Sequence, residues 1–473
     1  MPNITMKWLL PVIILVLVSG CTQESKQKCG MENCHGLDIT CGSNVPELCT
    51  LVYQFGDNCR QYASCEIIDG QCQLVTSNKF YECKSCVEKC IEGFEDNDTG
   101  LFRCENGCRM ATTTTTVVTT TTIEESQQCS EPIMFDYPPV VLDGVEYIRP
   151  LGCVGGSHVT PIDHQYLISK NYGTDQEAVS DVLSPADGTI TSIQHMGSIP
   201  TGYEYIAVDD YRVVIEHTCS ISSVFIHIDN LSEKIMAVAP SPGEYKSVSV
   251  AVSAGEVIGS YSGSLDYNVV DTDVELTGFV IPDSYNEEWK THIPDPFEYF
   301  NEPVRSQLIA KGLRTAEPIG GKIDYDIDGR LVGTWFKENT NKYAGLDPYN
   351  YWAGHLSIIY DCYDPEHIVV SFGNYSGSPR DTGVKGNAPD PADVGVGELV
   401  KYELVDYDYY DGNNHWDSSY LVKGLDARNN DAELHGTVLF QLTENRKLKM
   451  EIFDEKTASE VTGFTDNAIV YER

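Results

Sequence analysis

Three short segments between residues 150 and 300 carry the side chains that could do chemistry. His158, Asp163 and His164 lie together in "GGSHVTPIDHQYLIS", His227 lies in "VFIHIDNLS", and Asp266 lies in "GSLDYNVVD". Imidazole nitrogens and carboxylate oxygens are donors that zinc accepts in proteins, and histidine also transfers protons near neutral pH. These residue types therefore allow metal chemistry or acid–base chemistry, provided that the fold brings the three segments together.

The elements that must position these residues are β-strands. Two β-rich runs around a polar turn in "DYRVVIEHTCSISSVFIHI" predict a hairpin, and "VSVAVSAGEVIGSYSG" indicates two strands joined by a glycine turn. Helical periodicity is scarce, and the segment from Pro303, "PVRSQLIAKGL", is expected to be a short helix that joins two modules. We therefore expect a β-sheet domain over residues 129–302.

Residues 150–300 resemble the LytM-like M23 family, zinc metallopeptidases that cut peptidoglycan cross-bridges. "SPADGTITSI" is similar to the family's "APADGTVVSV", and "RVVIEHTCSISSVFIHIDNLS" is similar to "VVIDHGNGYSTLYAHLSSL", with His217 and His227 at the family's spacing. "VSAGEVIGSYSGS" and "SLDYNVVD" then take the places of "VKAGQVIGYVGST" and "HLHFEVRD". The resemblance implies a β-sheet groove with one zinc ion, whose open position lowers the pKa of a bound water to about 7.

The resemblance also assigns roles to single residues. His227 matches the histidine of the family's "YAHL" and is expected to carry proton transfer. The family's "HxH" falls on Ser264 and Asp266, so its first histidine is missing and its second is replaced by a carboxylate. The family's "HxxxD" has no match, because His158 and Asp163 in "SHVTPIDH" are one position too far apart.

A zinc site with exchanged ligand positions is the sharper of two hypotheses. It consists of His158, His164 and Asp266, with Asp163 as the alternative to His164, and it keeps the family's composition of two histidines and one carboxylate. The opposing hypothesis is a decayed site, in which "SHVTPIDH" is a polar turn and Pro161 excludes a helix. The sequence leaves both open.

Three functions follow, and whether the chain is an enzyme stays open. The first is a surface-anchored lipoprotein that hydrolyses cell-envelope peptide bonds with zinc, with reduced or altered activity because Ser264 cannot act as a base. The alternative is a catalytically inactive LytM-like protein that binds the envelope or serves in adhesion. The third is a lipocalin-like carrier, since "GTWF" is similar to the Gly-x-Trp of lipocalin-like barrels.

The N-terminus indicates export and a lipid anchor. Lys7 precedes the apolar run "WLLPVIILVLV", and "VSGC" follows, ending at Cys21. Such a segment is a secretory signal, and it is shorter than the roughly 20 apolar residues of a transmembrane helix. We expect residues 1–21 to be a signal peptide with a lipobox and Cys21 to be lipidated. An ordinary signal peptide or an uncleaved anchor is the alternative, and every version places the rest outside the membrane.

Cysteine content predicts an oxidising compartment. Removing Cys21 from the 17 cysteines leaves 16, an even number. By elimination, Cys129 is expected to pair with Cys153, and Cys219 with Cys362. The other twelve predict a disulfide framework in place of a large core. They are Cys29, Cys34, Cys41, Cys49, Cys59, Cys65, Cys72, Cys83, Cys86, Cys90, Cys104 and Cys108.

Length and charge bound the organisation and the partners. The 473 residues exceed one ordinary domain. We expect a cysteine-rich module at 22–110, a Thr-rich linker at 111–128, the LytM-like domain at 129–302, and a C-terminal antiparallel β-barrel or sandwich at 303–473. The formal charge of −39 argues against nucleic acid, because phosphate binding needs clustered Lys and Arg. The expected partners are a cell-envelope polymer or a surface protein, and the membrane through the lipid anchor.

Overall fold

The fold was analysed in a computed structural model, which describes most of the chain from Cys29 onward. The predicted signal peptide, the lipidation site Cys21 and the Thr-rich linker lie outside the described residues, as do Cys34, Cys49, Cys104, Cys108 and Cys129. The described residues are 29–33, 36–43, 56–68, 71–93, 133–196, 198–201, 204–207, 209–285, 287–347 and 350–473.

The cysteine-rich module is a small disulfide-bonded unit. Disulfides join Cys29 to Cys72, Cys41 to Cys65 and Cys59 to Cys83, and Cys86 and Cys90 are also disulfide-bonded. Its buried cluster is mostly cysteine with Phe80 and Val87, so covalent bonds replace a large core, as predicted. Its elements are β1 (Gly30–Met31), β2 (Cys41–Gly42), η1 (Asp57–Tyr62), β3 (Ala63–Ile68), β4 (Gln71–Thr76) and α1 (Asn78–Gly93).

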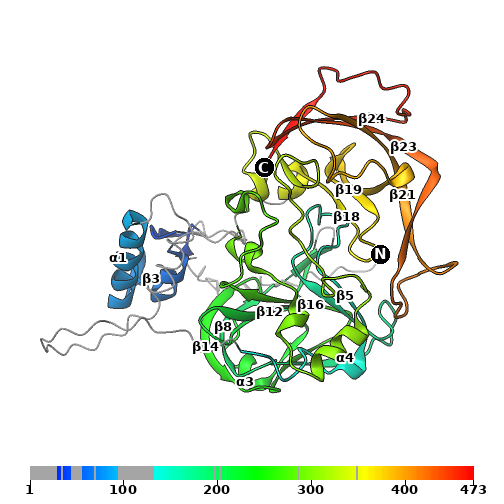
Figure 1. The fold of residues 1–473 in the computed structure, drawn as a ribbon. Helices are drawn as coiled ribbons and strands as arrows, with labels where there is room; N and C mark the ends of the chain where they lie inside the picture. The colour runs from blue at the N-terminus through cyan, green and yellow to red at the C-terminus, as the bar shows by residue number, and fades with distance from the viewer. Residues whose placement is uncertain are drawn as a thin grey trace, which may run out of the picture.

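The second unit is built on a seven-stranded antiparallel sheet in the order β14-β8-β11-β12-β16-β6-β5, drawn mostly in green in Figure 1. The predicted hairpin is β11 and β12, which pair directly. The strands of this sheet are β5 (Val145–Arg149), β6 (Gln165–Ser169), β8 (Gly188–His195), β11 (Tyr211–Glu216), β12 (Ile221–Ile228), β14 (Tyr245–Val252) and β16 (Ser264–Asp271).

Smaller elements surround this sheet. The short helix predicted after Pro303 is present as α4, and it packs with η5 against the main core. The elements are η2 (Leu142–Gly144), β7 (Ser180–Leu183), β9 (Ser198–Thr201), β10 (Glu204–Ala207), β13 (Asn230–Leu231), α3 (Glu233–Met236), β15 (Val257–Tyr261), η3 (Pro282–Ser284), η4 (Glu288–His292), η5 (Pro296–Tyr299) and α4 (Val304–Lys311).

The third unit is a closed barrel of eight antiparallel strands, so the predicted choice between barrel and sandwich is resolved as a barrel (Figure 1). Strands that follow one another pair in order, and β17 closes the ring by pairing with β25. The elements are β17 (Gly333–Lys337), η6 (Lys342–Ala344), η7 (Tyr351–Gly354), β18 (His355–Tyr360), β19 (Ile368–Tyr375), β20 (Ser378–Val384), η8 (Lys385–Asn387), β21 (Leu399–Asp411), β22 (Asn414–His415), β23 (Asp426–Glu444), β24 (Lys447–Asp454) and β25 (Ile469–Glu472).

The "GTWF" motif serves the barrel core. Trp335 is fully buried, and its indole donates a hydrogen bond to the carbonyl of Leu331. The Arg473 guanidinium lies 3.7 Å from the centre of the Trp335 ring and pairs with Asp326 at 3.2 Å. These contacts fasten the last strand of the barrel to the first and give the tryptophan a packing role.

The sheet unit and the barrel are joined by a shared core and by a disulfide. Leu151 and Ile293 of the sheet unit pack with Phe336 and Tyr343 of the barrel segment in one buried cluster. A disulfide connects Cys153 to Cys362 across 209 positions.

This bond corrects the expected pairings of Cys153 with Cys129 and of Cys219 with Cys362. Elimination along the sequence favours partners near each other in the chain. The segment after β5 instead packs against the barrel, which brings Cys153 to Cys362. Cys219 is also disulfide-bonded.

Candidate functional site

The predicted site residues lie on one face of the seven-stranded sheet. Alternate residues of β16 point to opposite faces, and Leu265, Tyr267 and Val269 fill the main core. Asp266 therefore lies on the opposite face. Residues that pair directly across antiparallel strands share a face, and Asp266 pairs with Tyr166 of β6 on one side and with Ile226 of β12 on the other.

Two histidines meet at the Asp266 carboxylate. His164, directly before β6, places its Nε2 atom 3.2 Å from Asp266 Oδ2. His227, near the end of β12, places its Nε2 atom 3.5 Å from the same oxygen. Burial raises the pKa of the Asp266 carboxyl, since its side chain is only 7% exposed. Three residues singled out from the sequence are thus brought together.

A distortion of β12 turns His227 toward this face. Phe225 and Ile228 both lie in the main core, so the two residues between them share the outer face. The pairing of β11 with β12 shifts register here, and His227 has a φ of 71°. Bulges of this kind re-aim side chains, and a left-handed non-glycine residue costs about 1–3 kcal/mol. The local strain is consistent with a functional position.

Each of these imidazoles is held from behind by a second carboxylate. His164 Nδ1 lies 3.0 Å from Asp163 Oδ1, and His227 Nδ1 lies 3.1 Å from Asp210 Oδ2. The hydrogen bond to Asp210 raises the pKa of His227. Burial would lower the pKa of His164, but Asp163 and Asp266 outweigh it and raise that pKa. Both rings therefore direct Nε2 toward Asp266.

Asp163 belongs to a buried charge network that reaches the barrel. Its Oδ2 atom lies 3.3 Å from Lys290 Nζ, and Lys290 is 3% exposed. Burial alone would raise the pKa of Asp163, but Lys290 and the hydrogen bond to His164 lower it. Lys290 Nζ also donates to the Tyr343 hydroxyl at 3.3 Å and lies over that ring. Both oxygens of Asp163 are therefore engaged behind His164.

The remaining histidines of the motif have other surroundings. His158 is exposed at a tight turn, where its backbone and that of Gly155 exchange hydrogen bonds, and its ring centre lies 6.1 Å from that of His164. His217 contacts the Asp187 carbonyl at 3.0 Å and the Ser223 hydroxyl at 2.9 Å. His158 is thus at the rim of the His164–Asp266 group, whereas His217 has a structural environment.

The donor set fits zinc in several respects. His164 Nε2 and Asp266 Oδ1 are buried, and neither has a hydrogen-bond partner among the described residues. Two ligands about 2.0–2.1 Å from a tetrahedral zinc ion lie roughly 3.3 Å apart, close to the two distances at Asp266. Histidine ligands of metals usually donate their other ring nitrogen to a carboxylate, as His164 and His227 are placed to do.

The same donors do not form a complete metal site as they stand. No group of three or more His, Cys, Asp or Glu in the described segments has an arrangement that could hold a metal ion. Two pairs of these donors, His164 with Asp266 and His227 with Asp266, have distances that suit ligands of one zinc ion, and both imidazoles face the same Asp266 oxygen. A metal ion would require the two rings to adjust around it.

Sequence reasoning missed three residues around this group. Asp210 directly precedes β11, and the pairing of Tyr211 with Ile228 brings it next to His227. That proximity could have been inferred from the predicted hairpin. Lys290 is brought near by tertiary packing and Arg149 by the pairing of β5 with β6, so the local sequence carries no signal for them.

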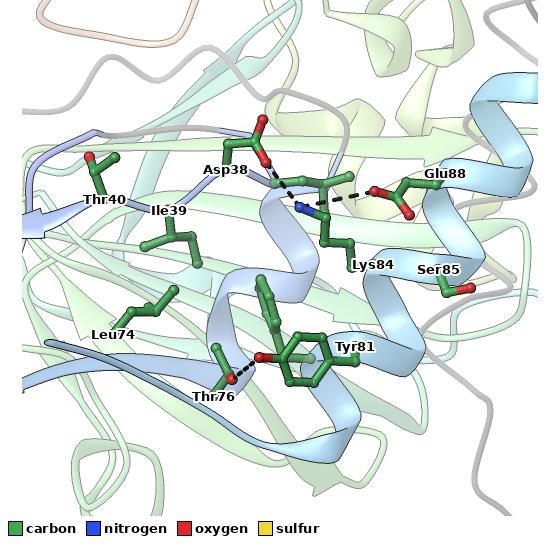
Figure 2. Close-up of a pocket in the computed structure, with 11 residues that line it drawn as sticks. Asp38, Ile39, Thr40, Leu74, Thr76, Tyr81, Lys84, Ser85 and Glu88 are labelled. Carbon is green, nitrogen blue, oxygen red and sulfur yellow. Dashed lines mark hydrogen bonds and ion pairs between the residues drawn. The ribbon is translucent and has the colours of Figure 1, made fainter.

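A concave surface lies on the cysteine-rich module, away from these residues, with a volume of about 500 Å3 (Figure 2). Lys84 points toward Asp38, at 2.9 Å, and Glu88, at 4.0 Å, while the Thr76 hydroxyl donates to that of Tyr81. Its charges are therefore paired with one another. The remaining lining is mainly apolar: Leu37, Ile39, Leu74 and Phe80.

No family model and no curated protein matches this chain. Within the segments that the structure describes, none of the helices has the length and apolar character needed to cross a membrane.

Proposed function

We propose that the sheet unit is an M23-like, zinc-dependent hydrolase of cell-envelope peptide bonds. One observation carries the proposal: two imidazoles, each backed by a carboxylate, converge on the buried carboxylate of Asp266. Buried charges are normally paired and hydrogen-bonded. His164 Nε2 is paired with Asp266 Oδ2 by distance but has no partner in hydrogen-bond geometry, and Asp266 Oδ1 has no hydrogen-bond partner among the described residues. A shared cation would satisfy both atoms.

Under this proposal His164, His227 and Asp266 hold the zinc. The sequence predicted that His158 binds zinc and that His227 transfers protons. The contacts favour the reverse, because His227 rather than His158 contacts Asp266. Zinc bound there would act as a Lewis acid and lower the pKa of a bound water to about 7.

The chain's own residues supply positioning and proton transfer. Asp163 and Asp210 fix the ring orientation of the two histidine ligands and keep Nε2 directed at Asp266. His158, exposed at the rim, is the imidazole placed to exchange a proton with solvent. Ser264 cannot replace the family's histidine as a base, so turnover is expected to be slower than in the family.

The alternative is a metal-free module that binds the cell envelope. The observation that favours it is the incomplete donor arrangement within the described residues. In this case His164 and His227 are ion-paired with Asp266, and this polar face of the sheet recognises an envelope polymer or surface protein without cleaving it.

We also propose that the mature chain is anchored outside the cell membrane through lipidated Cys21. The support is the sequence of the N-terminal segment together with the disulfides of the cysteine-rich module and of the barrel. Disulfides of this number are typical of exported proteins. Metabolic labelling with a fatty acid would test it: incorporation into the wild type but not into Cys21→Ser is expected.

Hydrolysis is tested on purified cell-envelope peptidoglycan with the mature protein prepared without chelator. New amino groups should appear, the activity should stop with a zinc chelator, and zinc should restore it. Asp266→Asn should be inactive, while Asp209→Asn, an exposed neighbour of Asp210 that is 69% accessible, should retain activity. Binding to peptidoglycan without any release of amino groups in the zinc-loaded protein would instead support the envelope-binding module.

A further inference from the structure

Arg149, the last residue of β5, is a partly buried guanidinium beside the candidate site. Its Nε atom is buried and has no hydrogen-bond partner among the described residues. The guanidinium shares a side-chain hydrogen bond with the Tyr147 hydroxyl, and its other main electrostatic neighbours are the hydroxyls of Tyr166 and Tyr363 rather than carboxylates. Buried arginines are almost always paired with an acid, so an arginine surrounded by tyrosines has an unused capacity for an anion.

The position of Arg149 relates it to Asp266. Arg149 pairs directly with Tyr166, and Tyr166 pairs directly with Asp266. The three residues therefore project from the same face of neighbouring strands. Two strand spacings separate the Cα atoms of Arg149 and Asp266 by roughly 9.6 Å. An extended peptide rises about 3.3 Å per residue, so a peptide crossing the strands would bring a group two or three residues from Asp266 to Arg149.

The barrel supplies one wall of this position. Tyr363 follows Cys362, whose disulfide to Cys153 holds it against the sheet unit. The Trp416 ring contacts the rings of Tyr147 and Tyr363 edge to face, at 5.7 Å and 6.0 Å between centres. The guanidinium therefore lies where the two units meet, among rings held by packing.

The chemistry of the guanidinium selects the ligand. Its planar fork matches the two oxygens of a carboxylate, and charge-assisted hydrogen bonds of this kind are stronger than neutral ones. The Tyr147 hydroxyl already donates to the carbonyl of Ser418, so further hydrogen bonds to the same group would come from Tyr166 and Tyr363. The formal charge of −39 opposes anions at long range, so recognition of an acidic ligand depends on a local cation of this kind.

We propose that Arg149 binds a carboxylate of the peptide substrate, in a subsite completed by Tyr363 of the barrel. This rests on the proposed function, because the peptide is taken to lie across β6 toward Asp266. It assigns the substrate class as peptides with a free carboxylate near the scissile bond. It also gives the barrel a part in substrate recognition.

The test uses the metal-free mature protein and two probes, acetyl-triglycine with a free carboxylate and the same peptide as its amide. Calorimetry gives the affinities, and the Nε–H nuclear magnetic resonance signal of Arg149 reports contact. We expect the acid to bind about tenfold or more tightly than the amide and to shift that signal. Arg149→Gln should bind both peptides equally, Arg149→Lys should keep part of the preference, and the control Arg305→Gln, at a side chain that is 32% exposed, should keep all of it.

The proposal would be overturned if the wild type bound the two peptides with equal affinity, or if it bound neither measurably. The same preference in Arg149→Gln would also overturn it. Thermal unfolding verifies the fold of each variant, and Arg149→Lys keeps the test valid if the glutamine variant does not fold. Zinc binding of Arg149→Gln is measured separately and should match the wild type, so a failed subsite is distinguished from a failed zinc site.

Discussion

Asp266 is the residue around which the proposed chemistry is arranged. Its carboxylate is buried, and burial raises its pKa, yet two imidazoles with raised pKa values contact the same oxygen. The resemblance to M23 peptidases predicted a carboxylate in a histidine position. The structure adds Asp210 and places Asp163, the alternative ligand to His164, behind the His164 ring, so that the two carboxylates orient the two rings.

Asp210→Asn should weaken zinc binding about 10- to 100-fold, the usual effect of losing a carboxylate behind a histidine ligand. The reason is that His227 would lose the partner that directs its Nε2 atom. Competition against a chromophoric chelator measures the affinity. Asp209→Asn is the matched control and should bind as the wild type does; an Asp210→Asn affinity equal to that of the control would contradict the assignment.

The residues could be predicted from sequence to different extents. His164, His227 and Asp266 were found because family-like segments flank them and β pairing brings such segments together. The predicted hairpin places Asp210 near His227, but the contact between their side chains depends on the bulge at the end of β12, which the sequence does not reveal. His158 was expected to be a ligand, and its place at the rim follows from a turn geometry that residue types do not encode.

Strand β6 and helix η4 jointly hold the site in place. His164 and Asp163 precede β6, and Lys290 of η4 neutralises Asp163 inside the protein. The same lysine contacts Tyr343, which belongs to the segment that packs the barrel onto the sheet. The orientation of His164 therefore depends on the contact between the two units.

Lys290→Met should lower the free energy of unfolding by about 3–5 kcal/mol, the usual cost of leaving a buried charge without its partner. Asp163 would lose its cation in a buried setting. Denaturant unfolding at neutral pH measures the loss. Lys322→Met removes a half-exposed lysine that pairs with Asp324 at 3.5 Å and should cost less than about 1 kcal/mol. A loss for Lys290→Met no greater than for this control would refute the network.

His355, at the start of β18, makes stability depend on pH. Burial lowers its pKa to about 4, and its ring stacks on Tyr343. In the unfolded chain the His355 imidazole has a pKa of about 6.5, so at acidic pH it binds a proton that the buried ring in the folded protein does not bind. Stability from this group is therefore complete above pH 6.5 and falls as the pH drops toward 4, by about 2 to 3 kcal/mol.

Unfolding free energies at pH 7 and pH 4.5 measure this effect. His355→Gln should show a smaller difference between the two values than the wild type does. His415→Gln, at a histidine that is 56% exposed, should show the wild-type difference. An unchanged difference in His355→Gln would show that another group causes the pH dependence.

The sheet unit and the barrel form a single packed assembly in which the Cys153–Cys362 bond links regions far apart in sequence. Strand alternation and glycine turns allowed the sequence to predict two β units, and the density of cysteines predicted a disulfide module. The disulfide partner could not be predicted, because it depends on how two independently patterned units pack. Closure of the barrel likewise depends on pairing between its first and last strands.

Cys153→Ser with Cys362→Ser should lower the free energy of unfolding of the two β units by about 2–5 kcal/mol. The bond restricts the unfolded chain over a long loop and holds the turn that carries His158 against the barrel. Denaturation without reductant measures the loss. Cys29→Ser with Cys72→Ser, in the cysteine-rich module, should leave this transition unchanged; equal stability of the wild type and the first double variant would contradict the account.

Whether His164, His227 and Asp266 hold zinc is tested by the zinc content of the mature protein, purified without chelator, loaded with zinc and dialysed. One zinc ion per chain is expected, lost in Asp266→Asn and in His164→Gln and retained in the exposed control His415→Gln. Zinc at background level in the wild type, or equal zinc in wild type and Asp266→Asn, would contradict this zinc site.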